Sequence, residues 1–348
     1  MIARVERGGR VRPFGSGAAK PSPVRRRARR GAIAFVARRA AAALPVLIGV
    51  TLLTFIVVDV MPGGAARQLL GPEATEAQVA QLEHELGLDR PAWQRYAAWL
   101  GGAVRGDLGE SLASGQSVAR LLGERLPVTL QLVAYGFAAA LGGAVLAALF
   151  AARRPEGWAD RLTMVMSLAS LAAPSYLIAI ALVLVFAVGW PLLPSIGYTP
   201  LGESAAGHLR SMTLPALAIA LPMFGLYCRF LRGDLVEQMQ SEGYVLTALA
   251  KGLTPWRVLA GHALRNSLLG LLTLVGVNAG NLIGGTVIVE QIFTLPGLGQ
   301  LLLQSVHARD VPVILAVVLV LAVATVVANL VVDLLYAVLD PRIRHGRG

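Results

Sequence analysis

Six long apolar segments, each close to the length of a membrane-spanning helix, constrain this chain more than any other feature. A helix needs about 20 mostly apolar residues to cross the hydrocarbon core of a bilayer. Hydrophobic residues make up 55% of the chain and charged residues only 15%, which excludes an ordinary soluble domain. The sequence therefore predicts an all-α polytopic membrane protein with six transmembrane helices, at residues 40–61, 128–152, 162–188, 213–231, 267–289 and 311–339.

The distribution of positive charge predicts which side of the membrane each loop faces. Cytoplasmic loops accumulate Lys and Arg, and most of the 31 basic residues lie in the N-terminal tail, in segments 153–161 and 229–265, and at the C-terminus. We therefore expect both termini to be cytoplasmic. The first apolar segment is too long and too far from the N-terminus for a cleaved signal peptide, so we expect it to remain as an anchor. The other basic residues are Arg67, Arg90, Arg95, Arg105, Arg120, Arg125, Arg210 and Arg309.

The N-terminal residues 1–37 are rich in Arg, Pro and Gly and are expected to form a disordered basic cytoplasmic tail. Much of the net charge of +11 lies there, beside the first span. Anionic lipid headgroups are the expected contact, because no aromatic residues alternate with the arginines as they would in a nucleic-acid-binding segment. Residues 345–348 are expected to form a short C-terminal tail.

The segment 61–127 is the longest predicted extracytoplasmic loop and is expected to contain two helices. Thr75 is a plausible N-cap for the first, and Pro91 is well placed to begin the second. The aromatic residues of the second helix are expected at the membrane interface, where such rings are enriched, with contact to another protein as the alternative. These residues are Trp93, Tyr96 and Trp99.

The segment 241–266 is the most distinctive polar interval between the apolar spans. It is helix-prone and far longer than the two to eight residues, roughly, that suffice to connect antiparallel helices. Small residues such as Ala248 and Gly252 would let another protein approach closely, and larger apolar side chains could anchor it. We interpret the segment as a docking element, with an ordinary connector as the alternative. The candidate anchors are Tyr244, Leu249 and Leu253.

Several sequence blocks occur in an order that is typical of one transporter family. They read ARRAAAALPVLIGVTLLTF, LGLDRPAWQRY, RGDLGESL, ERLPVTLQL, YVLTALAKGLTPWRVLAGHALRNSLL, VIVEQIFTLPGLGQLL and NLVVDLLYAVLDPRIR. With these blocks, residues 38–344 resemble the permease subunit of bacterial binding-protein-dependent ABC importers. The resemblance is to the first of two permease types in the oligopeptide, dipeptide and nickel branch. Leu246 departs from the pattern, because this branch commonly has Arg there.

The resemblance implies a type I ABC importer transmembrane domain in the bacterial inner membrane, carrying peptides or similar solutes. The implied partners are a paralogous second permease, two ATPase subunits or domains and an extracytoplasmic substrate-binding protein. Segment 241–266 would carry the coupling helix that docks on an ATPase, and ATP and Mg would be bound by the ATPase subunits and not by this chain. The implied coupling residues are Tyr244, Ala248, Leu249, Lys251, Gly252 and Leu253.

The fifth apolar segment carries glycines four residues apart, a spacing that allows close helix approach in lipid. Gly276, Gly280 and Gly284 are expected to pack against another helix, either of this chain or of the partner permease. Asn278 and Asn281 on the same segment either line a translocation path or serve as hydrogen-bonding glue between helices. Prolines within the spans are expected to kink or weaken them. These are Pro45, Pro174, Pro215 and Pro222.

No enzyme or metal-site signature is found in the sequence. A phosphate-binding P-loop needs Gly-Lys followed by Ser or Thr, whereas Lys20 precedes Pro21 and Lys251 precedes Gly252. No HExxH or G-x-S-x-G pattern occurs, so neither a metalloprotease nor an intramembrane hydrolase is expected. ATP hydrolysis is therefore expected in separate subunits.

The alternative to an ABC permease is an ion-coupled secondary transporter. Such carriers place ionisable residues near the bilayer midplane. Here Asp59, Glu290 and Asp333 fall near the predicted span ends, which disfavours that alternative. The sequence leaves the solute open among dipeptides, oligopeptides, nickel and glutathione-like compounds.

Overall fold

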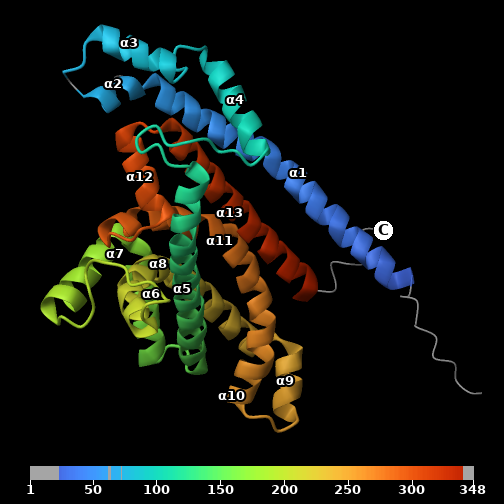
Figure 1. The fold of residues 1–348 in the computed structure, drawn as a ribbon. Coiled ribbons are helices and arrows are strands. Elements are labelled where there is room, and N and C mark those ends of the chain that lie inside the picture. Colours follow the sequence, from blue (N-terminus) through green and yellow to red (C-terminus); the bar gives the residue numbers. More distant parts are fainter. Residues whose placement is uncertain (1–22, 62–63, 72, 340–348) are drawn as a thin grey trace, which may run out of the picture. The chain divides into compact units, whose positions relative to one another are not determined.

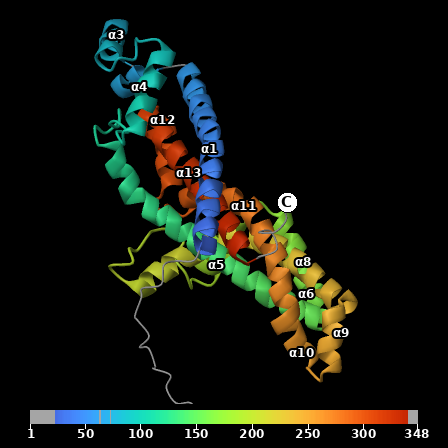
Figure 2. The ribbon, with the colours of Figure 1, turned by 90° about the vertical axis from the view of Figure 1, so that its right-hand side faces the viewer.

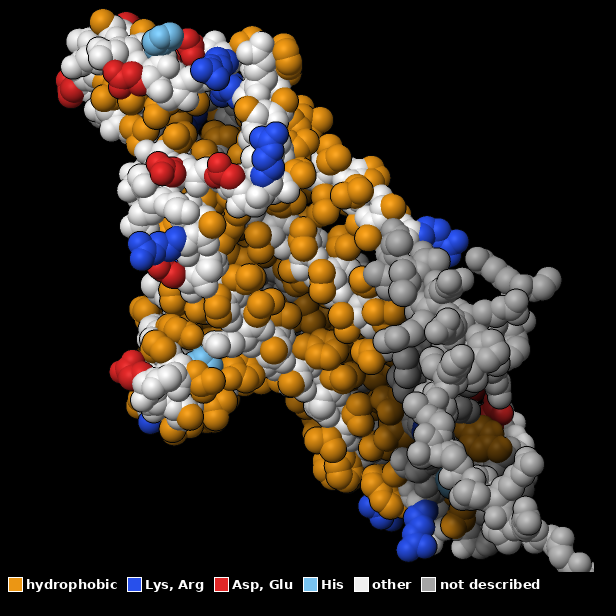
Figure 3. Space-filling model, turned by 45° about the vertical axis from the view of Figure 1, so that its right-hand side comes forward, with side chains coloured by type: hydrophobic (Ala, Val, Ile, Leu, Met, Phe, Trp, Pro, Cys, Tyr) orange, Lys and Arg blue, Asp and Glu red, His pale blue; other side chains and the backbone are white. Residues whose placement is uncertain are grey.

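The computed structural model describes residues 23–61, 64–71 and 73–339, and these are almost entirely helical (Figure 1). No strand occurs among them, and a lone β-bridge joins Glu110 and Ser117. The described residues from 45 onward form one compact unit, distinct from those up to 44. On the face drawn in Figure 3, hydrophobic side chains cover much of the surface, as expected for a protein solvated by lipid.

Five continuous helical stretches among the described residues are long and apolar enough to cross a membrane, and a bent helix pair makes six when it is counted as one span. The pair consists of α6 (Trp158–Ala172) and α7 (Ser175–Leu182), which continues into the π-helix η1 (Val183–Gly189). Five of the six predicted spans are thus confirmed as continuous helices, and the third corresponds to the bent pair. The five continuous stretches involve α1 (Pro23–Val60), α5 (Val118–Arg153), α8 (Ala205–Ser241), α11 (Leu264–Ile292) and α13 (Val311–Leu339).

The third span turns by 112° at Pro174, so the expectation of one helix over residues 162–188 is wrong. Ala173 has extended backbone angles, φ −95° and ψ 125°, as the ring of a following proline favours. Pro174 lacks an N–H group for the helical ladder and is the N-cap of α7. The prolines at 45, 215 and 222 lie inside helices that continue through them.

Helix α1 begins at Pro23, which differs from the disorder predicted over residues 1–37. Residues 1–22 lie outside the described range, and residues 23–37 are helical. The Ala and Arg residues that dominate this stretch are strong helix formers, and proline is well suited to a first helical position. The predicted C-terminal tail, 345–348, also lies outside the described residues.

Helices α5 and α8 form the core of the membrane domain. Small residues of α5 recur every fourth position, and Ala140, Ala144 and Ala148 are completely buried. Gly136 continues this row, and a Cβ atom added there would lie 2.5 Å from the side chain of Ile219 on α8. Side chains this small let two helix backbones approach closely in a membrane, where van der Waals packing drives association.

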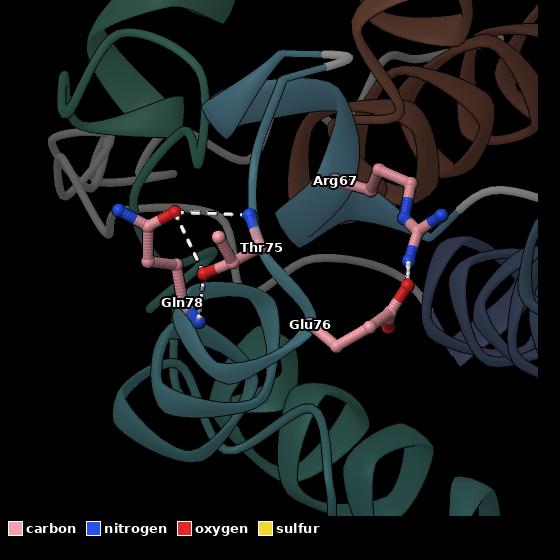
Figure 4. Close-up of polar contacts among 4 residues, drawn as sticks. All are labelled: Arg67, Thr75, Glu76 and Gln78. Carbon is pink, nitrogen blue, oxygen red and sulfur yellow. Dashed lines mark hydrogen bonds and ion pairs between the residues drawn. The ribbon is translucent and has the colours of Figure 1, made fainter.

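The two helices predicted within segment 61–127 are present as α3 (Glu76–Glu85) and α4 (Ala92–Val104), preceded by the short α2 (Ala65–Leu70). Thr75 caps α3 as predicted: its hydroxyl accepts a hydrogen bond from the Gln78 N–H, and the Gln78 side chain accepts one from the Thr75 N–H over 2.9 Å (Figure 4). This reciprocal arrangement is a capping box. An ion pair between Arg67 and Glu76 joins α2 to α3.

The aromatic residues of α4 do not share the single interfacial position predicted for them. The Trp93 side chain is 69% exposed, but Tyr96 is buried against Phe55 and Leu315. The Tyr96 hydroxyl lies 2.9 Å from Thr51 Oγ1 and donates to the Ile48 carbonyl oxygen. Tyr96 therefore attaches α4 to α1 and α13 through protein contacts, because its ring and hydroxyl both find partners there.

A tight turn after α11 leads into α12 (Leu298–Ala308), which precedes α13. The buried Glu290 carboxylate accepts hydrogen bonds from the N–H groups of Gly299 and Gln300, at 2.7 and 3.2 Å. The Thr129 hydroxyl accepts from the Leu298 N–H over 2.8 Å. These contacts satisfy amide groups in the first turn of α12, which have no partner within the helix.

Candidate coupling surface and translocation path

The segment 241–266 contains an eight-residue helix, α9 (Gly243–Ala250), which lies at the opposite end of the membrane domain from α3 and α4 (Figure 2). Only Glu242, in an extended conformation, separates α9 from α8. After α9 the chain passes through α10 (Pro255–Val258) and the π-helix η2 (Leu259–Ala263) into α11. Helix α9 is therefore a short helix within the connection between two long ones, α8 and α11.

Gly252 terminates α9 in a Schellman motif. Its φ angle of +84° lies in the left-handed region, which glycine adopts without steric penalty. The Gly252 N–H donates to the Leu249 carbonyl over 2.9 Å, and the Leu253 N–H donates to the Ala248 carbonyl over 3.3 Å. Among the predicted coupling residues, Gly252 thus shapes the end of the helix, and Lys251 beside it is exposed.

One face of α9 packs against its own chain. Val245 and Ala248 are buried together with Val258 of α10. Ala248, predicted to admit a partner's surface, therefore faces inward. All three predicted anchors are half-buried around this cluster, namely Tyr244, Leu249 and Leu253.

The opposite face of α9 is open. Leu246 is 62% exposed, and Thr247 and Ala250 are exposed beside it. Residues three and four apart share a face of a helix, so positions 243, 246, 247 and 250 lie opposite 245 and 248. Helical periodicity groups these positions in the sequence, but the contact with Val258 is needed to show which group faces inward. Leu246 is therefore a contact candidate that the predicted set omitted.

Aromatic contacts attach α10 to the end of α5. The Trp256 ring stacks on Phe150 with centroids 6.2 Å apart, and the Arg153 guanidinium lies 5.8 Å from the Trp256 centroid. Arginine over an indole face is a favourable cation–π contact. Displacement of the α9 segment would thus displace α5 as well as the two long helices that flank it in sequence.

The three glycines of α11 have different surroundings. A Cβ atom at Gly276 would lie 2.7 Å from Val332, and one at Gly280 would lie 3.1 Å from Thr325, so both positions face α13. Gly284 is exposed, with no atom within 4 Å of an added Cβ. The structure brings the first two glycines into packing within this chain and places the third on an open surface.

Asn278 and Asn281 form a small polar pair on α11. The Asn278 amide donates to the Leu274 carbonyl over 2.9 Å, and the Asn281 amide donates to the Asn278 side-chain oxygen over 3.3 Å. Asn278 is half-buried, whereas Asn281 is exposed. An exposed amide at this depth is costly against hydrocarbon and favours a neighbour that offers water or polar groups.

Asn281 also lines a cavity of about 300 Å³ beside the break in the third span. Pro174 and Ser175 form one side of this cavity, and Pro222 and Met223 of α8 form another. Among the described residues, no group of three or more His, Cys, Asp or Glu side chains is arranged to hold a metal ion. Apart from Ser175 and Asn281, the residues that line the cavity are apolar.

Comparison with known proteins establishes the family. Residues 143–345 match the family described as the binding-protein-dependent transport system inner membrane component. Residues 32–133 match the N-terminal part of such membrane components. The chain belongs to this family.

The relatives described next align with most of this chain and with nearly all of their own length. The chain is 39% identical over 312 residues to a putative peptide transport system permease protein of Brucella abortus, spanning 90% of this chain and 99% of that protein. It is 35% identical over 315 residues to the oligopeptide transport system permease protein AppB of Bacillus subtilis, with the same shares covered. It is 36% identical over 312 residues to the glutathione transport system permease protein GsiC of Escherichia coli, with 89% and 99% covered.

Family membership confirms the predicted all-α permease fold and the predicted class of transporter. The protein is a permease subunit of an ABC importer and a multi-pass protein of the inner membrane. Its relatives are transport permeases and not catalytic enzymes, and importers of this kind work with ATPase and binding-protein partners. No finding supports the ion-coupled carrier.

Proposed function

We propose that this permease forms half of the translocation pathway of a peptide importer. Peptides are favoured because relatives that match over nearly their full length are named for peptide, oligopeptide and glutathione transport, and glutathione is itself a tripeptide. A paralogous permease supplies the other half of the pathway, two ATPase subunits or domains bind ATP and Mg, and a binding protein delivers the solute. This chain then needs no cofactor of its own.

The outer face of α9 is the proposed contact with an ATPase subunit, and this geometry carries the proposal. Leu246 and Ala250 form a small apolar surface that is exposed, while Val245 and Ala248 hold the helix against its own chain. An exposed apolar patch with a rigid backing is typical of an interface. The docking side is cytoplasmic in this proposal, in agreement with the positive charge of segment 229–265 and with both termini inside.

The proposed path for the solute runs beside the break in the third span. Asn281 and Ser175 offer neutral hydrogen-bonding groups at a cavity whose remaining walls are largely apolar. Neutral polar groups bind peptides of different sequence weakly, as a pathway requires if it is not to trap its cargo. Closure of the ATPases would move α9 and change which side of the membrane this cavity faces.

Leu246→Glu tests the docking face. A carboxylate in a close-packed interface loses its hydration without gaining a partner, so recovery of ATPase subunits with the tagged permease should fall about tenfold or more. Val104→Glu adds the same charge at the end of α4, where the side chain is 81% exposed, and should leave recovery unchanged. Equal recovery with both variants and the unmodified chain would show that α9 is not the contact.

Uptake by the complete transporter in proteoliposomes tests the solute class. A pool of radiolabelled di- to pentapeptides should accumulate in the presence of ATP and the binding protein, and an excess of unlabelled peptides should compete. Accumulation of nickel with no accumulation of peptides would overturn the peptide assignment, while leaving the contact between α9 and the ATPase intact.

A further inference from the structure

Gln238, three residues before the end of α8, contacts two other elements with one side chain. Its amide nitrogen donates to Ser267 Oγ of α11 over 3.1 Å and to the Asp234 carboxylate of its own helix over 2.8 Å. Its amide oxygen accepts a hydrogen bond from the Tyr244 hydroxyl of α9. A single glutamine thereby connects α8, α9 and α11.

The orientation of this amide follows from its partners. The Asp234 carboxylate only accepts hydrogen bonds, so the Gln238 side chain must present its NH₂ group there. The amide oxygen then faces Tyr244, whose hydroxyl must donate. Ser267 is buried, with 1% of its surface exposed, so the contact with α11 lies in the packed interior. The carboxylate of Asp234 thus holds the amide in the one orientation that serves both neighbouring helices.

The joint between α8 and α9 is crossed by a directional contact as well as by apolar packing. Glu242 is the only non-helical residue between them, and it has the two rotatable backbone angles of an ordinary residue. The inner face of α9 makes apolar contacts through Val245 and Ala248, and such contacts are not directional. The hydrogen bond from Tyr244 to Gln238 spans Glu242 and is directional, which restrains rotation about this joint.

We propose that Gln238 is a positioning residue that makes α9 move as one body with the ends of α8 and α11. The inference rests on the proposed coupling role of α9. With the contact intact, a push on α9 is delivered to both long helices at once. Without it, α9 can rotate at Glu242, and ATP hydrolysis proceeds with less movement of the transmembrane helices.

Tyr244→Phe and Ser267→Ala each remove one contact of Gln238, Gln238→Leu removes all of its contacts together, and Gln240→Leu serves as the matched control. Tyr244→Phe and Ser267→Ala each delete one hydroxyl oxygen, so they remain informative even where Gln238→Leu lowers expression. Gln240 lies two residues further along the same helix and is exposed. All are studied in the complete transporter, purified through a tag on this chain.

The decisive measurement is the amount of peptide taken up per ATP hydrolysed, using the labelled peptide pool. Tyr244→Phe should lower this ratio about two- to tenfold, the range expected for loss of one hydrogen bond, and Gln238→Leu should lower it at least as much, with ATPase recovery unchanged. A merely structural role would lower the yield of the complex and leave the ratio unchanged. Ratios equal to that of Gln240→Leu for every variant would overturn the proposal.

A distance measurement gives a second test that needs no transported solute. In a Cys228→Ala background, spin labels at Lys251, the exposed C-cap of α9, and at the exposed Thr273 of α11 report the distance between these helices. The distribution should be narrow and equal before and after trapping with ATP and vanadate, and Tyr244→Phe should broaden it. A broad distribution in the unmodified transporter would refute the single rigid body. Failure to recover any ATPase with the unmodified chain would instead refute the coupling role of α9.

Discussion

The Glu290 carboxylate of α11 accepts a 2.7 Å hydrogen bond from the Thr129 hydroxyl of α5, although 161 positions separate the two residues in the chain. Both side chains also reach the first turn of α12, where their oxygen atoms accept hydrogen bonds from backbone N–H groups. The start of α12 is thereby held between two long helices. A negative charge is favourable at the start of α12, because it is attracted by the helix dipole and by the backbone N–H groups that have no partner within the helix.

We expect Glu290→Ala to destabilise the permease more than Glu290→Gln. Alanine leaves the buried N–H group of Gly299 and the half-buried one of Gln300 without an acceptor, which costs about 1–3 kcal/mol, whereas the amide oxygen of glutamine can still accept from them. Thermal unfolding in detergent measures the difference. The control is Glu124→Ala, which removes only an exposed ion pair with Arg120 and should change stability little. Equal stability of the two Glu290 variants would contradict this assignment.

Thr129→Val should show that Thr129 and Glu290 act together. Valine keeps the shape of threonine and removes the hydroxyl that contacts both Glu290 and the Leu298 N–H. The loss of stability in the double variant with Glu290→Ala should be smaller than the sum of the single losses, because both remove the same contact. Strict additivity in the same unfolding assay would show that the two side chains contribute independently.

Substitution of two glycines in α11 should affect the stability of the permease differently. Gly276→Leu should lower stability by about 1–3 kcal/mol, because its new side chain meets Val332 of α13. Gly284→Leu meets open space within this chain and should leave the unfolding temperature of the isolated permease unchanged or higher. Differential scanning fluorimetry of both variants decides the matter, and similar destabilisation at both positions would contradict the different packing of the two glycines.

Gly252 should be needed for the local order of α9 and not for the fold as a whole. Gly252→Ala places a side chain at a φ of +84°, a conformation that costs roughly 1–2 kcal/mol for residues other than glycine. Gly243→Ala is the control, since that glycine has an ordinary φ and open surroundings. Hydrogen exchange across residues 243–253 should accelerate only in Gly252→Ala, and unchanged exchange would show that the Schellman turn is not limiting.

Features that depend on neighbouring residues could be predicted from the sequence. The capping box at Thr75 follows from residues three positions apart, and the spans follow from the lengths of the apolar segments. The bend at Pro174 was foreseeable as a weakness but not as a turn of 112°, because proline also lies inside the intact helix α8. Tertiary packing decides which prolines break a helix.

Contacts between distant segments could not be predicted in this way. Ala248 and Leu246 both fit a docking helix by composition, and only the position of Val258 on α10 shows that Ala248 faces inward. The contact of Gln238 with Ser267 joins positions 29 apart, and no local pattern marks it. The family resemblance implies a coupling role for the segment as a whole, whereas the role of each side chain within it depends on the fold.

The orientation of the permease predicts which residues are accessible from outside the cell. Most basic residues lie on the side assigned to the cytoplasm, so segment 61–127 should face outward and α10 inward. In a Cys228→Ala background, Gln81→Cys on α3 and Arg257→Cys on α10 each provide one exposed thiol. A membrane-impermeant maleimide should label Gln81→Cys in spheroplasts and Arg257→Cys only after the membrane is permeabilised. Because both positions are exposed in the structure, a missing label reports sidedness and not burial, and the reverse pattern would place α9 on the outer side and exclude its contact with a cytoplasmic ATPase.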